Sequence, residues 1–474
     1  MSILRNFSLS LSITWVTINV YFLPFFPWTT GITRAWFVLK GLIPYRDFTW
    51  IRNPLDIFLL VQWFKVFGLT GEAYQLLIYA LFIVLTICVF ILSHKLLPHK
   101  PKLAFLFYTI FVFPLFINTE IGEVLIGVLN ILAFMAAYGF LKTRSIGLLF
   151  LAGFIAGLVF ITKQSSITIA LAIAFTLFLT NIAEKKSFRQ TASVFGIYLA
   201  GVFIPFIGII AYFAYNNALK DYLYYSIVFI LGPYSRLKPY ELTHGDGLWM
   251  AGAFLAVSVP FMLFWKDIKL RYQLVVLLIS LTFASLFSLL PSFLSYRAFP
   301  TFPLISIVFG YNIALLMQKN SSSIKRWVVV VSCIFFVVFV WHYIGEYIVF
   351  VQENGFAPKQ YIKDYGETEL NIAKWIRENT DQNERIQNFT SEIIYVLSNR
   401  LPKHKYIEPH PSILRPYSKS SEVFSKDPPV VVVYDESLPE IHIGLEKWPF
   451  IEYMKRHYER ISFSETLSVY KLIK

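Results

Sequence analysis

Long apolar runs recur along most of this chain, separated by short polar segments. A run of about 20 apolar residues forms a helix that crosses the hydrocarbon core of a bilayer. Backbone groups inside that core must be hydrogen-bonded within the protein, and a helix does this segment by segment. The pattern therefore predicts an α-helical polytopic membrane protein with about eleven transmembrane helices. The predicted spans cover residues 8–27, 73–93, 103–117, 122–141, 146–161, 165–182, 192–215, 248–265, 273–290, 301–318 and 327–345.

Two of these spans carry further information. The first follows Arg5 and ends near Pro27 without the small-residue site at which a signal peptide is cleaved, so we expect a retained signal anchor. The fifth contains Gly153 and Gly157, four residues apart. Small residues at this spacing favour close packing against another transmembrane helix.

The short loops between the spans alternate in charge. Every second loop holds Lys and Arg residues, whereas the loops between them hold Lys163, Arg297 and little else. Because basic loops stay in the cytoplasm, we expect a multi-pass protein of the plasma membrane with a cytoplasmic N-terminus and an external C-terminus. The basic loops contain Arg5; Lys95, Lys100 and Lys102; Lys142 and Arg144; Lys185, Lys186 and Arg189; Lys266, Lys269 and Arg271; and Lys319, Lys325 and Arg326.

The first external loop, residues 28–72, is long enough to have structure of its own. It contains an amphipathic helical pattern at 31–41 and a second apolar piece at 55–67, which Asp56 and Lys65 interrupt. Treating the second piece as a span would invert the charge rule for every later loop. We therefore expect both pieces to be helices that lie in the membrane interface.

The composition changes after Gly345, and residues 346–474 are polar enough to be soluble. Another long external loop, 216–247, carries a Tyr-rich segment that suits the headgroup region. We predict a transmembrane domain over 1–345 and a small C-terminal α/β domain outside the cytoplasm over 346–474. Within the latter, the pattern predicts helices at 369–380 and 448–458 and strands at 430–434 and 467–473.

Composition and motifs narrow the function. The net charge of +13 would suggest nucleic acid as a partner of a soluble protein, but the basic residues here sit in short loops, so we expect no nucleic-acid binding. Cys88 and Cys333 fall inside apolar spans and indicate no disulfide framework. The chain has no P-loop, no Gly-x-Ser-x-Gly and no His-Glu-x-x-His. No cytoplasmic loop is large enough for a nucleotide-binding domain, so we expect no nucleotide.

Acidic residues on the external side are few. Asp47 lies in the turn of the first external loop, and Glu120 and Glu123 flank the next external turn. A carboxylate at membrane depth, as expected for Glu123, is costly unless it is paired. The structural alternative for Asp47 is a turn residue paired with Arg46 or Arg52, and for Glu120 a solvated residue or a helix cap.

External cations are equally few. Lys163 lies where two spans meet, and Arg297 precedes a Pro-rich start of a span. Both suit a lipid phosphate, Arg through its planar fork and Lys as a point charge. The alternative is that their side chains reach lipid headgroups. His244 and Asp246 are candidates for a divalent metal, which one His alone supports weakly, so we leave the cofactor open.

Four motifs in this order resemble glycosyltransferases of the GT-C superfamily, especially the polyprenyl-phosphate-sugar-dependent group with protein O-mannosyltransferases and lipid A aminoarabinose transferases (glycosyltransferase family 39-like). The motifs are Gly-Leu-Ile-Pro-Tyr-Arg-Asp-Phe at 41–48 with Asn-Pro at 53–54, the Gly-rich segment 151–164 ending in Thr-Lys-Gln, Tyr-Arg at 296–297 before Pro-Thr-Phe-Pro, and Ala-Lys-Trp-Ile-Arg-Glu-Asn at 373–379 with Leu-Ser-Asn-Arg at 397–400.

The resemblance implies transfer of a sugar, with inversion, from a polyprenyl-phosphate donor to a hydroxyl of a lipid, glycan or protein acceptor on the external side. It also implies site residues. The catalytic candidates are Asp47 and Glu120; the donor phosphate would be held by Lys163, Arg297, Arg236 and Lys238; and the cavity would include Tyr45, Arg46, Glu123, Gln164 and Tyr296.

The chain departs from the family pattern at one point. The family places an Asp just after the first span, and residues 26–32 here contain no acid. Either Asp47 or Glu120 takes the role of the base, or the chain is a catalytically silent homologue. A transporter or lipid flippase is another alternative, but transporters show two related halves with interrupted helices, and we find no such duplication.

Overall fold

The computed structural model describes residues 14–16, 18, 28–97, 101–116, 119–234, 246–264, 271–287, 295–317, 322–354, 365–407, 417–438 and 448–473. The chain divides into two compact units. The first, the bundle unit, comprises Met1–Phe26, Gln75–Ile209 and Pro239–Ile362. The second, the loop-and-sheet unit, comprises Pro27–Tyr74, Ile210–Lys238 and Lys363–Lys474.

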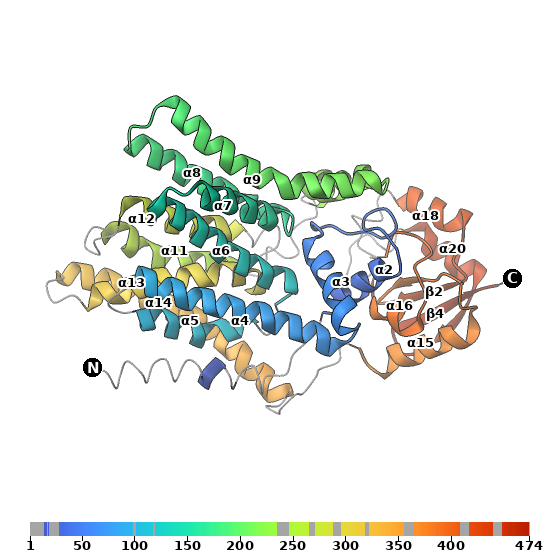
Figure 1. Cartoon of the computed structure of the whole chain (residues 1–474). Helices are drawn as coiled ribbons and strands as arrows, with labels where there is room; N and C mark the ends of the chain where they lie inside the picture. The colour runs from blue at the N-terminus through green and yellow to red at the C-terminus, as the bar shows by residue number, and fades with distance from the viewer. Residues whose placement is uncertain are drawn as a thin grey trace. The chain divides into compact units, whose positions relative to one another are not determined.

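The bundle unit consists mainly of long apolar helices (Figure 1). Every predicted span from 73–93 onward coincides with a helix, whereas span 8–27 falls almost wholly outside the described residues, so the count of eleven stays a prediction. The helices are α4 (Gly71–Leu96), α5 (Pro101–Phe116), α6 (Ile121–Thr143), α7 (Ile146–Phe160), α8 (Ile167–Ala183), α9 (Phe188–Tyr215), α11 (Asp246–Phe264), α12 (Tyr272–Leu286), α13 (Phe302–Leu316) and α14 (Ser323–Asn354), with short 3-10 turns η1 (Gln164–Ser166) and η6 (Ser295–Thr301). The boundary with the other unit falls inside α4 and α9.

Five helical stretches of the described chain are long and apolar enough to cross a membrane: Gly71–Leu96, Ile121–Thr143, Gln164–Ala183, Phe188–Tyr215 and Arg297–Leu316. Their burial differs widely. In Ile121–Thr143 and Arg297–Leu316, 72% and 83% of the most apolar window is buried inside the protein, against 22% in Phe188–Tyr215. The first two are therefore core helices of the bundle, and α9 turns most of its apolar surface outward, as a lipid-facing helix does.

The glycine pair in α7 explains one close contact. A Cβ atom added at Gly153 would lie 2.1 Å from the carbonyl oxygen of Tyr198, and one at Gly157 would lie 2.4 Å from that of Val202. On the facing helix, a Cβ at Gly201 would lie 2.4 Å from the carbonyl oxygen of Phe150. Helices α7 and α9 thus approach backbone to backbone, as the glycine spacing predicts.

The loop-and-sheet unit contains a four-stranded sheet of β1 (Gln387–Phe389), β2 (Val431–Asp435), β3 (Tyr458–Ser462) and β4 (Leu467–Leu472). The order is β1-β2-β4-β3, in which β1 and β2 are parallel and the other pairs antiparallel. The accompanying helices are α15 (Glu367–Asn379), α16 (Ile393–Ser398), α18 (Tyr417–Lys426) and α20 (Pro449–His457). The predicted small C-terminal α/β fold is confirmed, whereas its external location stays a prediction.

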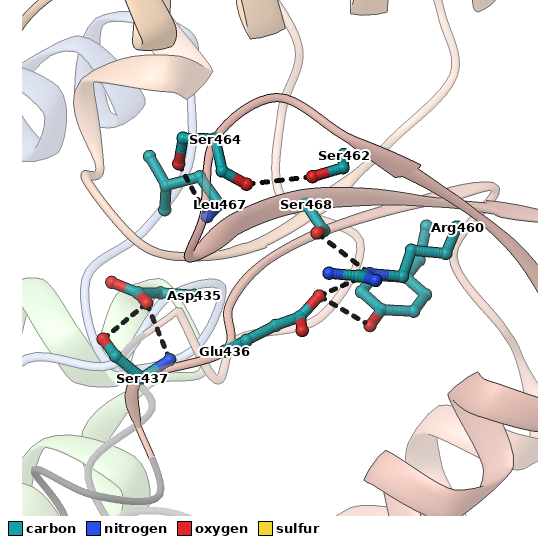
Figure 2. Close-up of polar contacts among 9 residues, drawn as sticks. Asp435, Glu436, Ser437, Arg460, Ser462, Ser464, Leu467 and Ser468 are labelled. Carbon is teal, nitrogen blue, oxygen red and sulfur yellow. Dashed lines mark hydrogen bonds and ion pairs between the residues drawn. The ribbon is translucent and has the colours of Figure 1, made fainter.

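Polar contacts complete the β3–β4 hairpin (Figure 2). Arg460 donates from Nε to Glu436 Oε1 at 2.6 Å and to Ser468 Oγ at 3.2 Å, across the face of the sheet. At the turn, the Leu467 amide donates to Ser464 Oγ at 2.9 Å. These contacts link β3 and β4 to Glu436, which follows β2.

The first external loop shares the core of this unit. Its helices are α2 (Thr29–Leu39) and α3 (Leu55–Phe67), and residues 219–234 add a short helix, α10 (Leu219–Leu223), followed by the π-helical turns η2 (Tyr224–Val228) and η3 (Ile230–Tyr234). Trp36, Phe37 and Phe48 are buried in one cluster with residues from α15, α16 and the sheet, such as Ile376 and Val433. The apolar face of 31–41 is therefore covered by protein; a position in the membrane interface stays a prediction for both pieces.

Candidate functional site

The site residues named from the sequence divide between the units. The bundle unit holds Glu120, Glu123, Lys163, Gln164 and Arg297, and the loop-and-sheet unit holds Tyr45, Arg46 and Asp47. Arg236, Lys238 and His244 lie outside the described residues, and no side chain is described for Asp246, at the start of α11, or for Tyr296 in η6.

In the bundle unit, Glu123 and Lys163 form a buried ion pair. Lys163 Nζ lies 2.6 Å from Glu123 Oε1, with exposed side-chain fractions of 7% and 1%. Glu123 sits in the first turn of α6, where the helix dipole favours a carboxylate. Lys163 follows α7, which packs against α6, and leads into η1. Each charge makes burial of the other tolerable.

The second carboxylate oxygen of this pair is unusual. Glu123 Oε2 is buried and has no hydrogen-bond partner among the residues that the structure describes. A buried acceptor left in this state costs about 1–3 kcal/mol, more when it is charged. Such an oxygen can accept a hydrogen bond from a ligand hydroxyl, so the cavity role expected for Glu123 is chemically reasonable.

Arg297 lies against the same helix through its own short segment. It is 8% exposed in η6, and η6 packs on α6: Asn130 Nδ2 lies 3.4 Å from the Pro300 carbonyl oxygen, and a Cβ at Gly127 would lie 3.4 Å from the Phe299 ring. Lys163 and Arg297 are thus both buried cations, Lys163 paired with Glu123 of α6 and Arg297 in a segment that packs on α6. Glu120 is half-buried at the N-cap of α6, and Gln164 is half-buried in η1.

In the loop-and-sheet unit, Arg46 engages both oxygens of Asp47. Arg46 Nε and Nη2 each lie 2.8 Å from one carboxylate oxygen, and the Ile43 amide donates to Asp47 Oδ2 at 2.8 Å. Burial raises the pKa of Asp47, but the bonds from Arg46 and Ile43 outweigh it and leave this pKa below its ordinary value. A carboxylate with three donors is a weak base, and this environment is unfavourable to the base role expected for Asp47.

The turn that carries this pair is strained and fully anchored. Tyr45 has a φ of 69°, in the left-handed region that a bulky residue rarely adopts. Its ring is fully buried, with centroids 5.1 Å from Phe213 and 5.2 Å from Tyr222, and its hydroxyl donates to the Arg52 carbonyl. Packing that holds such strain fixes the turn, and the cavity role expected for Tyr45 stays a prediction.

Sequence reasoning missed a second buried ion pair. Arg34 of α2 reaches Glu392, just before α16, with Nη2–Oε1 at 2.7 Å and Nε–Oε2 at 3.1 Å, and the exposed fractions are 4% and 9%. The guanidinium carbon also lies 4.2 Å from the centroid of the Trp50 ring. The sequence could have indicated Arg34, because it is a charged residue within the amphipathic helical pattern of 31–41. Nothing in the sequence indicated its partner Glu392, which lies 358 residues away.

Asp56 was noted only as an interruption of an apolar run. It lies in the first turn of α3 and is 6% exposed. Its Oδ1 accepts a hydrogen bond from the Ile57 amide at 2.8 Å. Burial raises the pKa of Asp56 to about 6, although Arg52, the Ile57 amide and Arg34 act to lower it. The environment of Asp56 thus raises its pKa, whereas that of Asp47, nine positions earlier, lowers its pKa.

No group of three His, Cys, Asp or Glu side chains that would hold a metal occurs within the described part of the chain. The metal candidates, His244 and Asp246, are not among the residues with described side chains. Cys88 and Cys333 are free and buried.

Comparisons with known proteins place the fold. No family model and no curated protein matches this chain. Two crystal structures of ArnT from Cupriavidus metallidurans are similar to it. The one bound to undecaprenyl phosphate has a TM-score of 0.56 at 10% identity, over 98% of this chain and 97% of that one. The apo structure has a TM-score of 0.56 at 9% identity, over 99% and 98%. The chain therefore has the same overall fold as these two ArnT structures.

Proposed function

We propose that this chain is an integral membrane glycosyltransferase that moves a sugar from a polyprenyl-phosphate donor to an acceptor hydroxyl on the external side. One observation carries the proposal: the likeness extends over nearly the whole of both chains to an ArnT structure solved with undecaprenyl phosphate. The apolar helices agree with a membrane protein.

The chemistry asks little of the protein beyond charge and position. The bond from the sugar's anomeric carbon to the phosphate oxygen breaks, its electrons leave with the phosphate, and the acceptor oxygen attacks the opposite face with inversion. Lys163 and Arg297, both buried, would neutralise the leaving phosphate. In a site shielded from water, such stabilisation is worth several kcal/mol. Arg236 and Lys238 remain candidates for the same role.

The charge paired with Lys163 supports a binding site rather than a purely structural contact. Glu123 holds the Lys163 ammonium in place at 2.6 Å while leaving one of its own oxygens without a partner in the described part of the chain. Ionisable groups buried among membrane helices mark ligand paths by default.

A panel of labelled polyprenyl-phosphate sugars, presented to membranes that contain the chain, tests the proposal. We expect transfer of one label, and binding of undecaprenyl phosphate by the purified protein. Arg297→Gln should weaken that binding at least tenfold and Arg297→Lys less, because only Arg offers a planar fork. The matched control is Arg144→Gln, whose side chain is exposed beside Glu184.

Two results would contradict the proposal. Transport of a lipid-linked sugar without cleavage favours the flippase alternative, and binding of undecaprenyl phosphate without transfer of any label favours a silent homologue. The orientation has its own test: a reporter fused after residue 474 should be active only outside the cytoplasm, and activity inside would overturn the predicted topology.

A further inference from the structure

We propose that residues 219–231 form a membrane finger, a segment that inserts its exposed apolar face into the external leaflet of the bilayer. Lys220 lies at the level of the lipid phosphates and Leu231 lies deepest. The finger comprises α10, η2 and the start of η3, and it belongs to the loop-and-sheet unit. This inference stands apart from the proposed sugar transfer, because it concerns bulk phospholipid and would hold for a silent homologue too.

The two sides of the finger differ in what covers them. The side that packs into the protein carries buried residues that recur every three or four positions: Tyr222, Tyr225, Ser226 and Phe229. The exposed residues are Lys220 and then Tyr224, Ile227, Val228 and Leu231, of which the last four are 39–75% exposed. Their spacing places them on one helical face. A continuous apolar stripe of this kind marks contact with a membrane or with another protein.

The exposed face changes in character along the finger, and this change favours a bilayer. Lys220 comes first, Tyr224 lies about one turn later, and aliphatic side chains follow up to Leu231. Side chains occur in the same order across a membrane interface, with cations at the phosphates, tyrosine among the headgroups and aliphatic groups in the hydrocarbon. The stretch from Lys220 to Leu231 extends about 16 Å, more than the roughly 5–8 Å of one headgroup region.

The chain before the finger gives a second argument for lipid. Helix α9 ends at Tyr215, and only 22% of its most apolar window is buried inside the protein. Tyr215 itself is 89% exposed. The lipid-facing surface of α9 thus continues almost to Leu219, where the finger begins. A soluble partner or a second copy of this chain requires no gradient from charged to aliphatic residues, whereas a bilayer does.

The backbone of the finger suits hydrocarbon. Inside a bilayer, amide and carbonyl groups must be hydrogen-bonded within the protein. Helix α10 continues into the π-helical turns η2 and η3, so helical hydrogen bonds extend along the whole finger. Turns of this type are rare and often mark functional sites.

The base of the finger is fixed to the rest of its unit. The Tyr222 ring stacks on Phe213 of α9 with centroids 4.7 Å apart, and its hydroxyl donates to Asn53 Oδ1 at 3.3 Å. Lys405 Nζ lies 2.7 Å from Asp221 Oδ1. These contacts all lie in the first turn of the finger and on its buried side. They hold the base while the apolar face points away from the protein.

The turn that carries Tyr45 and Arg46 supports the hinge before the finger. Arg46 Nη1 donates to the Asn216 carbonyl at 2.9 Å, and the Tyr45 ring lies 5.2 Å from that of Tyr222. Asn217 has a φ of 54°, in the left-handed region that ends a helix and lets the chain change direction. This turn therefore helps to set the direction in which the finger leaves α9.

Spin labels in the full chain test the proposal by measuring depth in vesicles of phosphatidylcholine and phosphatidylglycerol. Cys88 and Cys333, both buried, are first replaced by Ala. Single labels are then attached to Lys220→Cys, Tyr224→Cys, Ile227→Cys and Leu231→Cys. The measured quantity is the ratio of label collisions with oxygen, which partitions into hydrocarbon, to collisions with a water-soluble nickel complex. We expect this ratio to rise in the order 220, 224, 227, 231, over a depth of about 10–16 Å.

Two labels calibrate the scale. Lys374→Cys, on the exposed face of α15, should give the value of water, and Phe203→Cys, at an exposed apolar position of α9, should give the value of lipid. If all four finger labels match the Lys374→Cys label, the finger lies in water and the proposal is overturned. Labels that neither reagent reaches also overturn it, because a protein then covers the stripe. Equal depths at 224, 227 and 231 overturn the insertion, because the segment then lies flat.

A second measurement asks whether the apolar stripe holds the finger in lipid. Ile227→Glu combined with Leu231→Glu should move the label at Tyr224→Cys toward the value of water, because carboxylates are costly in hydrocarbon. The matched control combines Ile227→Leu with Leu231→Ile, which keeps the face apolar and should leave that label at its original depth. An unchanged depth in the Glu variant would overturn the role of the stripe. Sugar transfer enters neither measurement, so the two proposals fail or stand independently.

Discussion

The bundle unit and the loop-and-sheet unit each contain one ion pair made of residues that the sequence named as site candidates. The N–O distances of the two pairs are nearly equal, but their exposed side-chain fractions differ widely. Lys163 Nζ lies 2.6 Å from Glu123, with 7% and 1% of the side chains exposed. Arg46 Nη2 lies 2.8 Å from Asp47, with 40% and 27% exposed. Distance alone would rank the pairs as equals. Solvent separates them, because water screens the second pair and not the first.

The difference indicates what each pair is for. Replacing a buried ion pair with apolar side chains of similar volume often leaves the stability of a protein unchanged or raises it. The buried Glu123–Lys163 pair is therefore weak evidence for stability, and a binding role for its charges is a hypothesis. An exposed pair contributes at most about 1 kcal/mol, so Arg46 and Asp47 matter for the geometry of their turn and little for its stability. Four variants, in order of expected effect on stability, test this reading.

The largest effect should come from Lys163→Met. It leaves the Glu123 carboxylate at 1% exposure without its cation, and breaking a buried pair in this way costs about 3–5 kcal/mol. The free energy of unfolding in detergent micelles measures it. Adding Glu123→Gln should recover most of the loss, while Lys142→Met, at an exposed position on α6, should change stability by less than about 0.5 kcal/mol. If Lys163→Met alone is as stable as the wild type, the Glu123–Lys163 pair is not buried.

Arg34→Met should have the next largest effect, about 3 kcal/mol, in the loop-and-sheet unit. It removes both hydrogen bonds to Glu392 and the contact with Trp50. The loss should be smaller than for Lys163 because Glu392, 9% exposed, can gain some hydration. Lys374→Met on the exposed face of α15 is the control. If Arg34→Met costs no more than the control, α2 is not held to the C-terminal segment by this pair.

A third effect depends on pH. Because the pKa of Asp56 is raised from 3.8 to about 6 in the fold, the folded state binds this proton more tightly than the unfolded state. Stability is therefore greatest below pH 4 and falls as the pH rises through 6, by about 2–3 kcal/mol. Asp56→Asn should remove this slope and be the more stable protein at pH 7.5. A wild-type stability that rises between pH 4 and 6 on account of this residue would reverse the sign.

The sequence predicted most of the fold, and its failures have physical reasons. Apolar runs located the helices from α4 onward, and the Val-rich run located β2. Strand β1 was missed because it is only three residues long and buries Gln387 and Asn388, whose side chains bond to the Tyr406 and Ser391 carbonyls. Strand β3 lies at the sheet edge and is mostly exposed, so its burial does not alternate.

The candidate site was predictable one residue at a time but not as pairs. Scarcity on the external side singled out Glu123 and Lys163, yet their contact depends on how α6 packs against α7. The amphipathic pattern of 31–41 indicates that one face of the helix is buried, but not which residues bury it. In the structure, residues of the C-terminal segment pack on this face. The environment of Asp56 follows from its burial and from the charges of Arg52 and Arg34, and no local pattern encodes it.

The smallest effect on stability should come from the exposed Arg46–Asp47 pair, whose role is better tested by measuring activity. Arg46→Gln should cost less than about 1 kcal/mol, and what it does cost should vanish at low pH, because the pKa of Asp47 is lowered in the fold and its contribution is lost as the pH falls through that pKa. Asp47→Asn then tests the base role expected for Asp47. The sequence alone predicts that it abolishes sugar transfer. An active and stably folded Asp47→Asn protein would remove Asp47 from the base role.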